Sequence, residues 1–306
     1  MPDDCRVAAI DCGTNSLRLL VSDVSGDAKR DIAREMRVVR LGEGVDRTGR
    51  FSAEALERTL SVTREYADLV SVLEADRVRF CATSAARDAA NVDELAAGVQ
   101  ELLGVPLEVL TGEEEARASY LGATRDLGGD ALVVDIGGGS TELVVGDAGE
   151  VRWATSLDIG SVRLTERFLH GDPASVDEVT ACETHLDALL APVVRELEEV
   201  TTLVGVAGTI TTVAAHALAL PSYDSTAIHG ARLPVEDVRN ACLSLVGMPV
   251  ADRRALPFMH PGRADVIGAG ALIVDRLLAL LPLATDVVTV SEQDILDGIA
   301  WQAASA

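Results

Sequence analysis

The residues best suited to chemistry lie in one short stretch, residues 135–142, which reads Asp-Ile-Gly-Gly-Gly-Ser-Thr-Glu. Apolar runs at 131–134 and 143–145 flank it, a pattern that predicts a β-hairpin with a Gly-rich turn. Consecutive glycines let several backbone N–H groups point the same way, which suits a phosphate. The carboxylates of Asp135 and Glu142 could hold a hard cation such as Mg²⁺. Ordinary loops also contain such turns, so the stretch alone indicates little.

A second copy of this pattern lies near the N-terminus. Shifting the sequence by 124 positions places residues 11–23 on residues 135–147, with six identities over thirteen positions inside the same strand–turn–strand pattern. This is an internal repeat, and it makes the turn a strong signal. It predicts two related domains that face each other across a cleft, each offering a phosphate-sized turn and an aspartate.

Three consecutive glutamates, Glu113, Glu114 and Glu115, open a predicted helix. Acidic side chains in a first helical turn complement the helix dipole, and this explanation is enough for two of them. The third could instead act as a general base, because a helix N-terminus also favours its ionised form.

Arginines are the candidate cations, since Lys29 is the only lysine. Arg87 follows a predicted strand, where α/β proteins place ligand-binding groups, and a guanidinium can grip a phosphoryl group with two hydrogen bonds. Arg18 lies two residues beyond the first turn, within plausible reach of what that turn holds. For these two and for Arg263, a surface salt bridge is the alternative interpretation.

Composition excludes several classes of function. The formal net charge of −23 argues against general nucleic-acid binding, so a polyanionic substrate must meet a local site built from arginine or bound metal. We expect no membrane contact, because the polar N-terminus does not resemble a signal peptide and the apolar segment 267–281 is too short to span a bilayer. The five scattered cysteines lack Cys-x-x-Cys spacing, which is typical of a reduced cytoplasmic protein.

Strand and helix patterns alternate between the two hairpins. This order predicts a layered α/β domain over residues 1–125 and a second domain over 126–293, with a closing helix at about 294–306 that packs back on the first. The elements predicted between the hairpins include strands at 37–41, 78–82 and 107–110 and a helix at 52–73.

Seven motifs occur in the order seen in one known family, and the chain resembles that family, the exopolyphosphatase/guanosine pentaphosphate phosphatases of the actin–sugar kinase–heat-shock ATPase superfamily. The resemblance covers nearly the whole chain. It implies an α/β fold of two ribonuclease-H-like domains with mixed sheets flanked by helices, and an active site in the cleft between them. The motifs are residues 11–19, 82–89, 112–116, 135–143, 207–209, 229–230 and 263–267.

The resemblance also implies a chemistry, the Mg²⁺-dependent release of a terminal phosphate from inorganic polyphosphate or guanosine pentaphosphate by a cytoplasmic enzyme. Members of the family often form homodimers. Glu115 would be the catalytic base, with Arg87 beside the phosphates. Asp135 and Glu142, with Asp11 of the first copy, would be ligands of Mg²⁺ or its water. The implied phosphate-binding residues are Gly13, Thr14, Asn15, Ser16, Arg18, Gly137, Gly138, Gly139 and Ser140, and Ser161 and Arg263 would hold the substrate further out.

Two departures from the family are visible. Gln293, Asp294 and Leu296 stand where the family usually has a Gly-Gly pair and an arginine. The helical C-terminal domains of longer members are absent, so we expect a two-domain form that favours shorter polyphosphates. A rival hypothesis from another class is a nucleotide-binding, actin-like regulator that changes shape instead of clearing phosphate.

Overall fold

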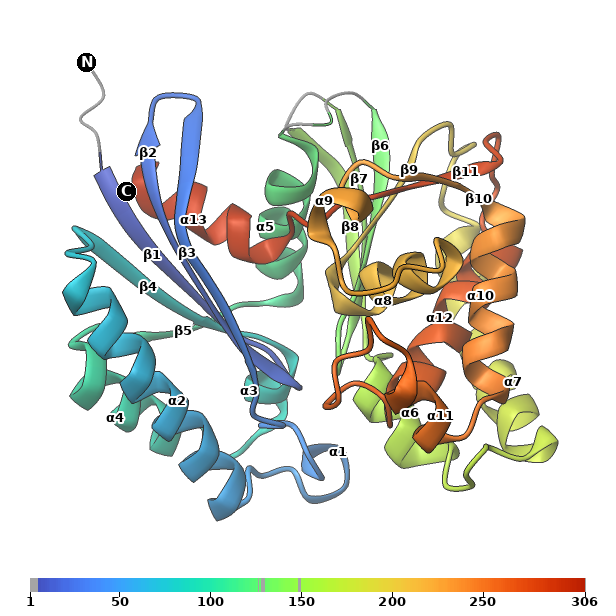
Figure 1. Ribbon diagram of the computed structural model, residues 1–306, viewed down its shortest axis with the longest axis horizontal. Coiled ribbons are helices and arrows are strands. Elements are labelled where there is room, and N and C mark those ends of the chain that lie inside the picture. Colours follow the sequence, from blue (N-terminus) through green and yellow to red (C-terminus); the bar gives the residue numbers. More distant parts are fainter. Residues whose placement is uncertain (1–4, 126, 128–129, 148–149, 306) are drawn as a thin grey trace. The chain divides into compact units, whose positions relative to one another are not determined.

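The computed structural model describes residues 5–125, 127, 130–147 and 150–305. The chain divides into two compact units, Met1–Gly122 with Asp294–Ala306, and Ala123–Gln293. Each unit contains one β-sheet with helices packed against it (Figure 1).

The sheet of the first unit has the strand order β3-β2-β1-β4-β5. The first three strands are antiparallel neighbours, whereas β4 and β5 run parallel to β1. Its strands are β1 (Cys5–Cys12), β2 (Ser16–Ser25), β3 (Ala28–Val38), β4 (Arg77–Ala82) and β5 (Leu107–Val109). Its helices are α1 (Val45–Thr48), α2 (Ala53–Val72), α3 (Ser84–Asp88), α4 (Val92–Leu103), α5 (Gly112–Thr124), which runs two residues into the second unit, and α13 (Ile295–Ser305).

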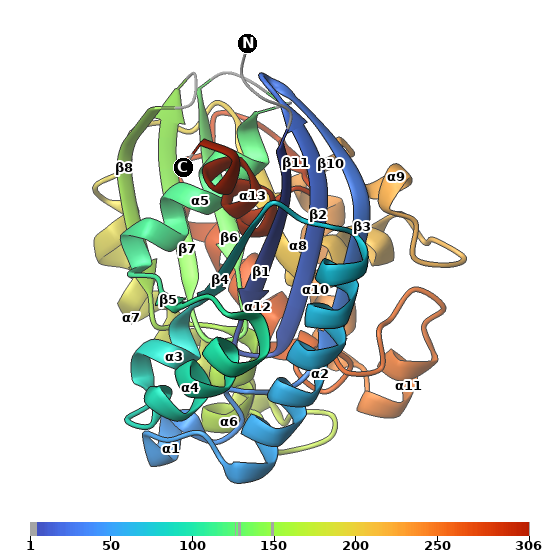
Figure 2. The ribbon, with the colours of Figure 1, turned by 90° about the vertical axis from the view of Figure 1, so that its left-hand side faces the viewer.

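Both faces of this sheet are buried, because successive side chains of a strand point to opposite faces. Ala8, Ile10 and Cys12 of β1 belong to the core under α2 and α4 (Figure 2). Val7 and Ala9, which alternate with them along the strand, belong to the core under α5 and α13. The near-continuous apolar run of β1 therefore follows from burial on two sides.

Two glycines bring α5 and α13 into direct backbone contact. A Cβ atom added to Gly122 would lie 1.9 Å from the carbonyl oxygen of Asp294, and one added to Gly298 would lie 1.9 Å from that of Ala118. Only glycine fits at either position, so this crossing holds the C-terminal helix on the first unit.

The second sheet repeats the first and adds one strand. Its order is β10-β11-β9-β6-β7-β8, so that β8-β7-β6-β9-β11 corresponds to β3-β2-β1-β4-β5. The strands are β6 (Ala131–Ile136), β7 (Thr141–Asp147), β8 (Glu150–Leu157), β9 (Leu203–Val206), β10 (Arg232–Pro234) and β11 (Val287–Val290). The helices are α6 (Ser161–Phe168), α7 (Val176–Val194), α8 (Ala207–Ala217), α9 (Ser225–Ile228), α10 (Val235–Gly247), α11 (Val250–Ala255) and α12 (Ile267–Leu280).

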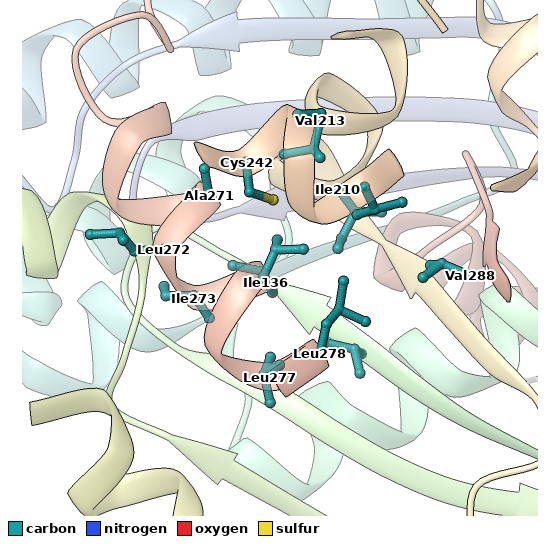
Figure 3. Packing of buried hydrophobic residues seen from close by; sticks show 14 of the residues in the cluster. Ile136, Ile210, Val213, Cys242, Ala271, Leu272, Ile273, Leu277, Leu278 and Val288 are labelled. Carbon is teal, nitrogen blue, oxygen red and sulfur yellow. The ribbon is translucent and has the colours of Figure 1, made fainter. Parts of the chain in front are cut away.

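Helix α12 lies at the centre of the second unit. Its Ala271, Ile273 and Leu277 are buried in the same cluster as Ile136 of β6 and Ile210 of α8 (Figure 3). Apart from Asp275 and Arg276 the helix is apolar on all sides. This pattern is typical of a helix that neighbouring elements cover on several sides.

The predicted α/β fold of two mixed sheets flanked by helices is confirmed. The predicted strand at 37–41 is wrong in its bounds, since β3 covers Ala28–Val38. Its charged sequence hides an edge strand whose pairing with β2 supplies the register. None of the described helices is both long enough and apolar enough to cross a bilayer.

Candidate active site

The two glycine-rich turns have the same backbone geometry. The N–H of Gly13 donates to the carbonyl of Ser16, and the N–H of Gly137 donates to that of Ser140, both at 3.0 Å. The predicted hairpins are confirmed, with Asp11 opposite Arg18 in one and Asp135 opposite Glu142 in the other. The internal repeat is therefore a repeat of structure as well as of sequence.

In the first unit, Arg18 forms a buried ion pair with Asp11. Its Nε and Nη2 donate to Asp11 Oδ2 at 2.9 and 2.6 Å, and its Nη1 donates to Asp294 at the start of α13. Burial raises the pKa of the Asp11 carboxyl, and the Arg18 charge opposes that shift. Asp11 Oδ1 is buried and has no hydrogen-bond partner among the described residues, so it is the oxygen left for a ligand or its water.

The segment after β3 donates backbone hydrogen bonds to the first turn. The Asn15 carbonyl accepts hydrogen bonds from the N–H groups of Val39 and Arg40, at 3.0 and 2.9 Å, and the Thr14 carbonyl accepts from Gly42 at 2.8 Å. A Cβ on Gly42 would lie 2.3 Å from Thr14 Cγ2, so any other residue here must displace the Thr14 side chain. Ser16, which begins β2, closes the turn.

Glu115 and Arg87 lie together in the first unit. Arg87 Nη1 donates to Glu115 Oε2 at 2.6 Å and to the Leu110 carbonyl at 2.9 Å. The carboxylate of Glu115 is buried and forms an ion pair with Arg87. The two residues predicted to be catalytic are therefore in direct contact, although no structural observation assigns their role.

The other two glutamates of this helix act on α5 itself. Glu113 pairs with Arg117 one turn later, at 2.8 Å. Glu114 accepts from the N–H and the hydroxyl of Thr111, at 2.8 and 2.9 Å, while Thr111 Oγ1 accepts from the N–H of Glu114. This reciprocal pair is a capping box, and it explains why only the third glutamate faces inward.

In the second unit, two carboxylates face each other at the mouth of the hairpin. Asp135 and Glu142 are both buried and occupy directly opposite positions on β6 and β7, where Cβ atoms lie about 5 Å apart. The hydroxyl of Ser156, on β8, donates to Glu142 Oε1 at 2.7 Å. Two buried like charges at this distance repel each other unless a cation lies near them.

This pair fits Mg²⁺. Among the described residues, His, Cys, Asp and Glu side chains form no group of three or more that could hold a metal ion. Mg²⁺ commonly takes only one or two carboxylates and completes its shell with water and substrate phosphate, so Asp135 and Glu142 would suffice.

The second turn is oriented by the start of α6. The Gly137 carbonyl accepts from the N–H of Ser161 at 3.0 Å, the Gly138 carbonyl from that of Val162 at 2.9 Å, and the Gly139 carbonyl from Arg163 Nε at 2.8 Å. In a trans peptide the N–H points opposite to the C=O, so the N–H groups of the next three residues face away from α6. Backbone N–H groups that point the same way can bind an anion such as phosphate. Ser161, a predicted substrate residue, hydrogen-bonds to the opposite side of this turn through its own N–H.

Arg263 lies further along the same edge of the second sheet. Its guanidinium rests on the peptide of Gly208, with Nη1 3.5 Å from that carbonyl, and a Cβ on Gly208 would lie 2.4 Å from Arg263 Cζ. The buried Arg253 braces this region by donating to the carbonyls of Leu245, Val246 and Ala264. The sequence interpretation missed Arg253, because nothing local distinguishes it from its neighbour Arg254.

Two other relevant residues were missed. Ser156 lies opposite Glu142 in the β7–β8 pairing, but a register shift between Val145 and Gly146 hides this, because counting from the turn places Thr155 there instead. Glu292 follows β11 and contacts Tyr223, and nothing in the sequence indicates that pairing.

Comparison with known proteins identifies the family. The model of the Ppx/GppA phosphatase family matches residues 20–304. Exopolyphosphatase 2 of Mycobacterium tuberculosis is 50% identical over 311 residues, which cover 96% of this chain and 97% of that protein. A family member from Aquifex aeolicus is 34% identical with a TM-score of 0.82, covering 97% of this chain and 96% of the other. An exopolyphosphatase from Cytophaga hutchinsonii is 26% identical with a TM-score of 0.91, covering 98% of each. The chain therefore belongs to the Ppx/GppA phosphatase family.

Proposed function

We propose that this phosphatase is an exopolyphosphatase, which releases the terminal orthophosphate of inorganic polyphosphate by direct attack of water. The observation that carries the proposal is the repeated glycine turn, in one copy of which two buried carboxylates face each other. One copy neutralises its aspartate internally, and the other has the charge to bind a cation together with a polyanion. The 50% identity to an exopolyphosphatase supports the choice of substrate.

The turns bind phosphoryl oxygens, and Glu115 takes the proton of the attacking water. Arg87 holds the Glu115 carboxylate in place through their ion pair. Mg²⁺, held by Asp135 and Glu142, would supply neutralisation of the phosphoryl charge. Ser161 and Arg263 hold the part of the polyphosphate that leaves.

Direct water attack is supported by the state of the one thiol next to a turn. Cys12 is buried, and burial together with the Asp11 charge raises the pKa of its thiol far above the ordinary value. A protonated, buried thiol is a poor nucleophile.

The test is phosphate release from polyphosphate in the presence of Mg²⁺ by the wild type and by two matched variants. Glu115→Gln should lower kcat by about 10²–10⁴, the usual scale for a general base. Glu114→Gln, the same change one residue earlier, should keep the wild-type kcat because Glu114 only caps α5. Wild-type turnover by Glu115→Gln would exclude the assigned role.

A second candidate substrate is guanosine pentaphosphate, because the matching family comprises both kinds of phosphatase. Both substrates present a terminal phosphoryl group to the same residues. Phosphate release from both, measured side by side at matched concentration, decides between them, and faster turnover of the nucleotide reverses our choice. An actin-like regulator would instead bind ATP tightly without releasing phosphate from either, and failure to bind ATP removes that alternative.

A further inference from the structure

The parallel strands β6, β9 and β11 all end along one edge of the second sheet, the edge that runs across the strands. In the register of β6, β9 and β11, Asp135 lies opposite Val206, and Gly205 lies opposite Val290. The N–H of Ser291 donates to the Gly205 carbonyl at 3.0 Å and continues the ladder. Glu292 is the next residue, two strands from Asp135, which corresponds to about 10 Å along the edge.

Arg263 occupies the strand position between them. It lies on Gly208, in the first turn of α8, which directly follows β9. A polyphosphate whose end is bound at the second turn, and which continues along this edge, meets Arg263 first and Glu292 second.

Glu292 is held firmly in this position. Its N–H donates to His229 Nδ1 at 3.2 Å, and its Oε1 accepts from the Tyr223 hydroxyl at 2.6 Å. The Tyr223 oxygen also lies 2.9 Å from Thr211 Oγ1. Burial and the Glu292 charge raise the pKa of Tyr223, so the phenol remains a donor to the carboxylate at every physiological pH.

We propose that Glu292 is a specificity-determining residue that limits the length of polyphosphate bound along this edge. The inference rests on the proposed exopolyphosphatase function and assigns the expected preference for short chains to this one carboxylate. Each further phosphate of a long chain brings negative charge towards a fixed carboxylate, whereas a short chain ends near Arg263. Two like charges close together at a protein surface repel each other, and salt weakens that repulsion. Such repulsion changes a Michaelis constant without any contact with the reacting phosphorus.

The test compares KM for tripolyphosphate and for long-chain polyphosphate in the wild type and in Glu292→Gln. The amide keeps the hydrogen bond from Tyr223 and removes only the charge, so folding should be unaffected. We expect KM for the long chain to fall by about 3- to 10-fold, with KM for tripolyphosphate and both kcat values within about twofold. Glu292→Asp, which keeps the charge, should retain most of the wild-type length dependence.

The matched control is Glu236→Gln. Glu236 is exposed in the first turn of α10, directly after Pro234, which pairs with the first residue of β11 and so lies at the opposite edge of the sheet. It changes the net charge equally and should leave both KM values unchanged. A fall in KM of the same size in both variants would assign the effect to overall charge and overturn the proposal.

The remaining outcomes separate this inference from the proposed function. If the wild type hydrolyses polyphosphate and Glu292→Gln leaves the length dependence unchanged, or raises KM for all lengths, only the role of Glu292 is overturned. If the wild type releases phosphate from no polyphosphate of any length, the proposed function fails and the inference with it.

Discussion

The two hairpins have the same strand pairing and differ in the charge of the side chain opposite the aspartate. Opposite its aspartate the first hairpin has Arg18, and the second has Glu142. The first aspartate is neutralised within its own unit, and Arg18 is itself held by Asp294. The second aspartate lies opposite another buried acid, a pair that a cation would stabilise. One duplicated frame thus carries a closed ion pair in one copy and, we propose, a metal site in the other.

The largest effect that we expect is on stability, when the arginine that distinguishes the first hairpin is removed. Arg18→Ala leaves the buried carboxylates of Asp11 and Asp294 without their partner, which should cost about 3–5 kcal/mol in the free energy of unfolding. Each unit contains one of the two tryptophans, Trp301 in the first and Trp153 in the second. Urea unfolding followed by Trp301 fluorescence, in a Trp153→Phe background, therefore reports the first unit alone.

Arg30→Ala is the control for that measurement. Arg30 pairs with Asp23, but its side chain is 73% exposed, so its loss should cost less than about 1 kcal/mol. Equal losses in the two variants would show that the Arg18 pair is no stronger than a surface contact.

The next effect concerns the metal requirement of the second hairpin. Glu142→Gln should reduce kcat/KM on the order of 100-fold, or about 2.7 kcal/mol, and raise the Mg²⁺ concentration needed for half-maximal rate. Chelation of divalent ions should abolish wild-type activity, and added Mg²⁺ should restore it. Glu150→Gln, an exposed glutamate that begins β8, is the matched control. Full activity after chelation would contradict the metal role of both carboxylates.

A smaller difference is expected between the glycines that brace the two turns. A Cβ on Gly160 would lie 2.4 Å from the backbone of Gly138, whereas one on Gly42 would meet side chains, Thr14 Cγ2 at 2.3 Å and Ala85 Cβ at 3.2 Å. A side chain can rotate away more easily than a backbone can move, so Gly160→Ala should cost about 1–3 kcal/mol and Gly42→Ala less. Trp153 reports the first variant and Trp301 the second, and the reverse order would show that the first turn is the more rigid.

The smallest effect concerns the cap of α5. Backbone and hydroxyl donors of Thr111 lower the pKa of Glu114, so its contribution to stability is present above its unfolded pKa of about 4.3 and is lost as the pH falls through the lower folded value. Glu114→Gln should cost about 0.5 kcal/mol at pH 7, and the difference should disappear at low pH. A difference that persists when the carboxyl is protonated would exclude the charged cap as its source.

Much of this molecule was predictable because many of its signals are local. The glycine turns and their apolar flanks, read from neighbouring residues, predicted both hairpins, and the repeat at an offset of 124 residues predicted two related domains. The family resemblance implied the two mixed sheets. The family resemblance singled out Glu115 among three adjacent glutamates. Strand β3 was misplaced because its charged sequence carries little strand signal, and only its pairing with β2 reveals it.

The sequence by itself determined the repeated frame, since each turn closes through a hydrogen bond between residues three positions apart. Tertiary structure alone decided which charges meet. Arg18 reaches Asp294 across 276 positions, Arg87 reaches Glu115 across 28, and Tyr223 reaches Glu292 across 69. No local pattern encodes such pairs, because they arise only when the sheets and helices bring distant segments together and burial forces each charge to find a partner.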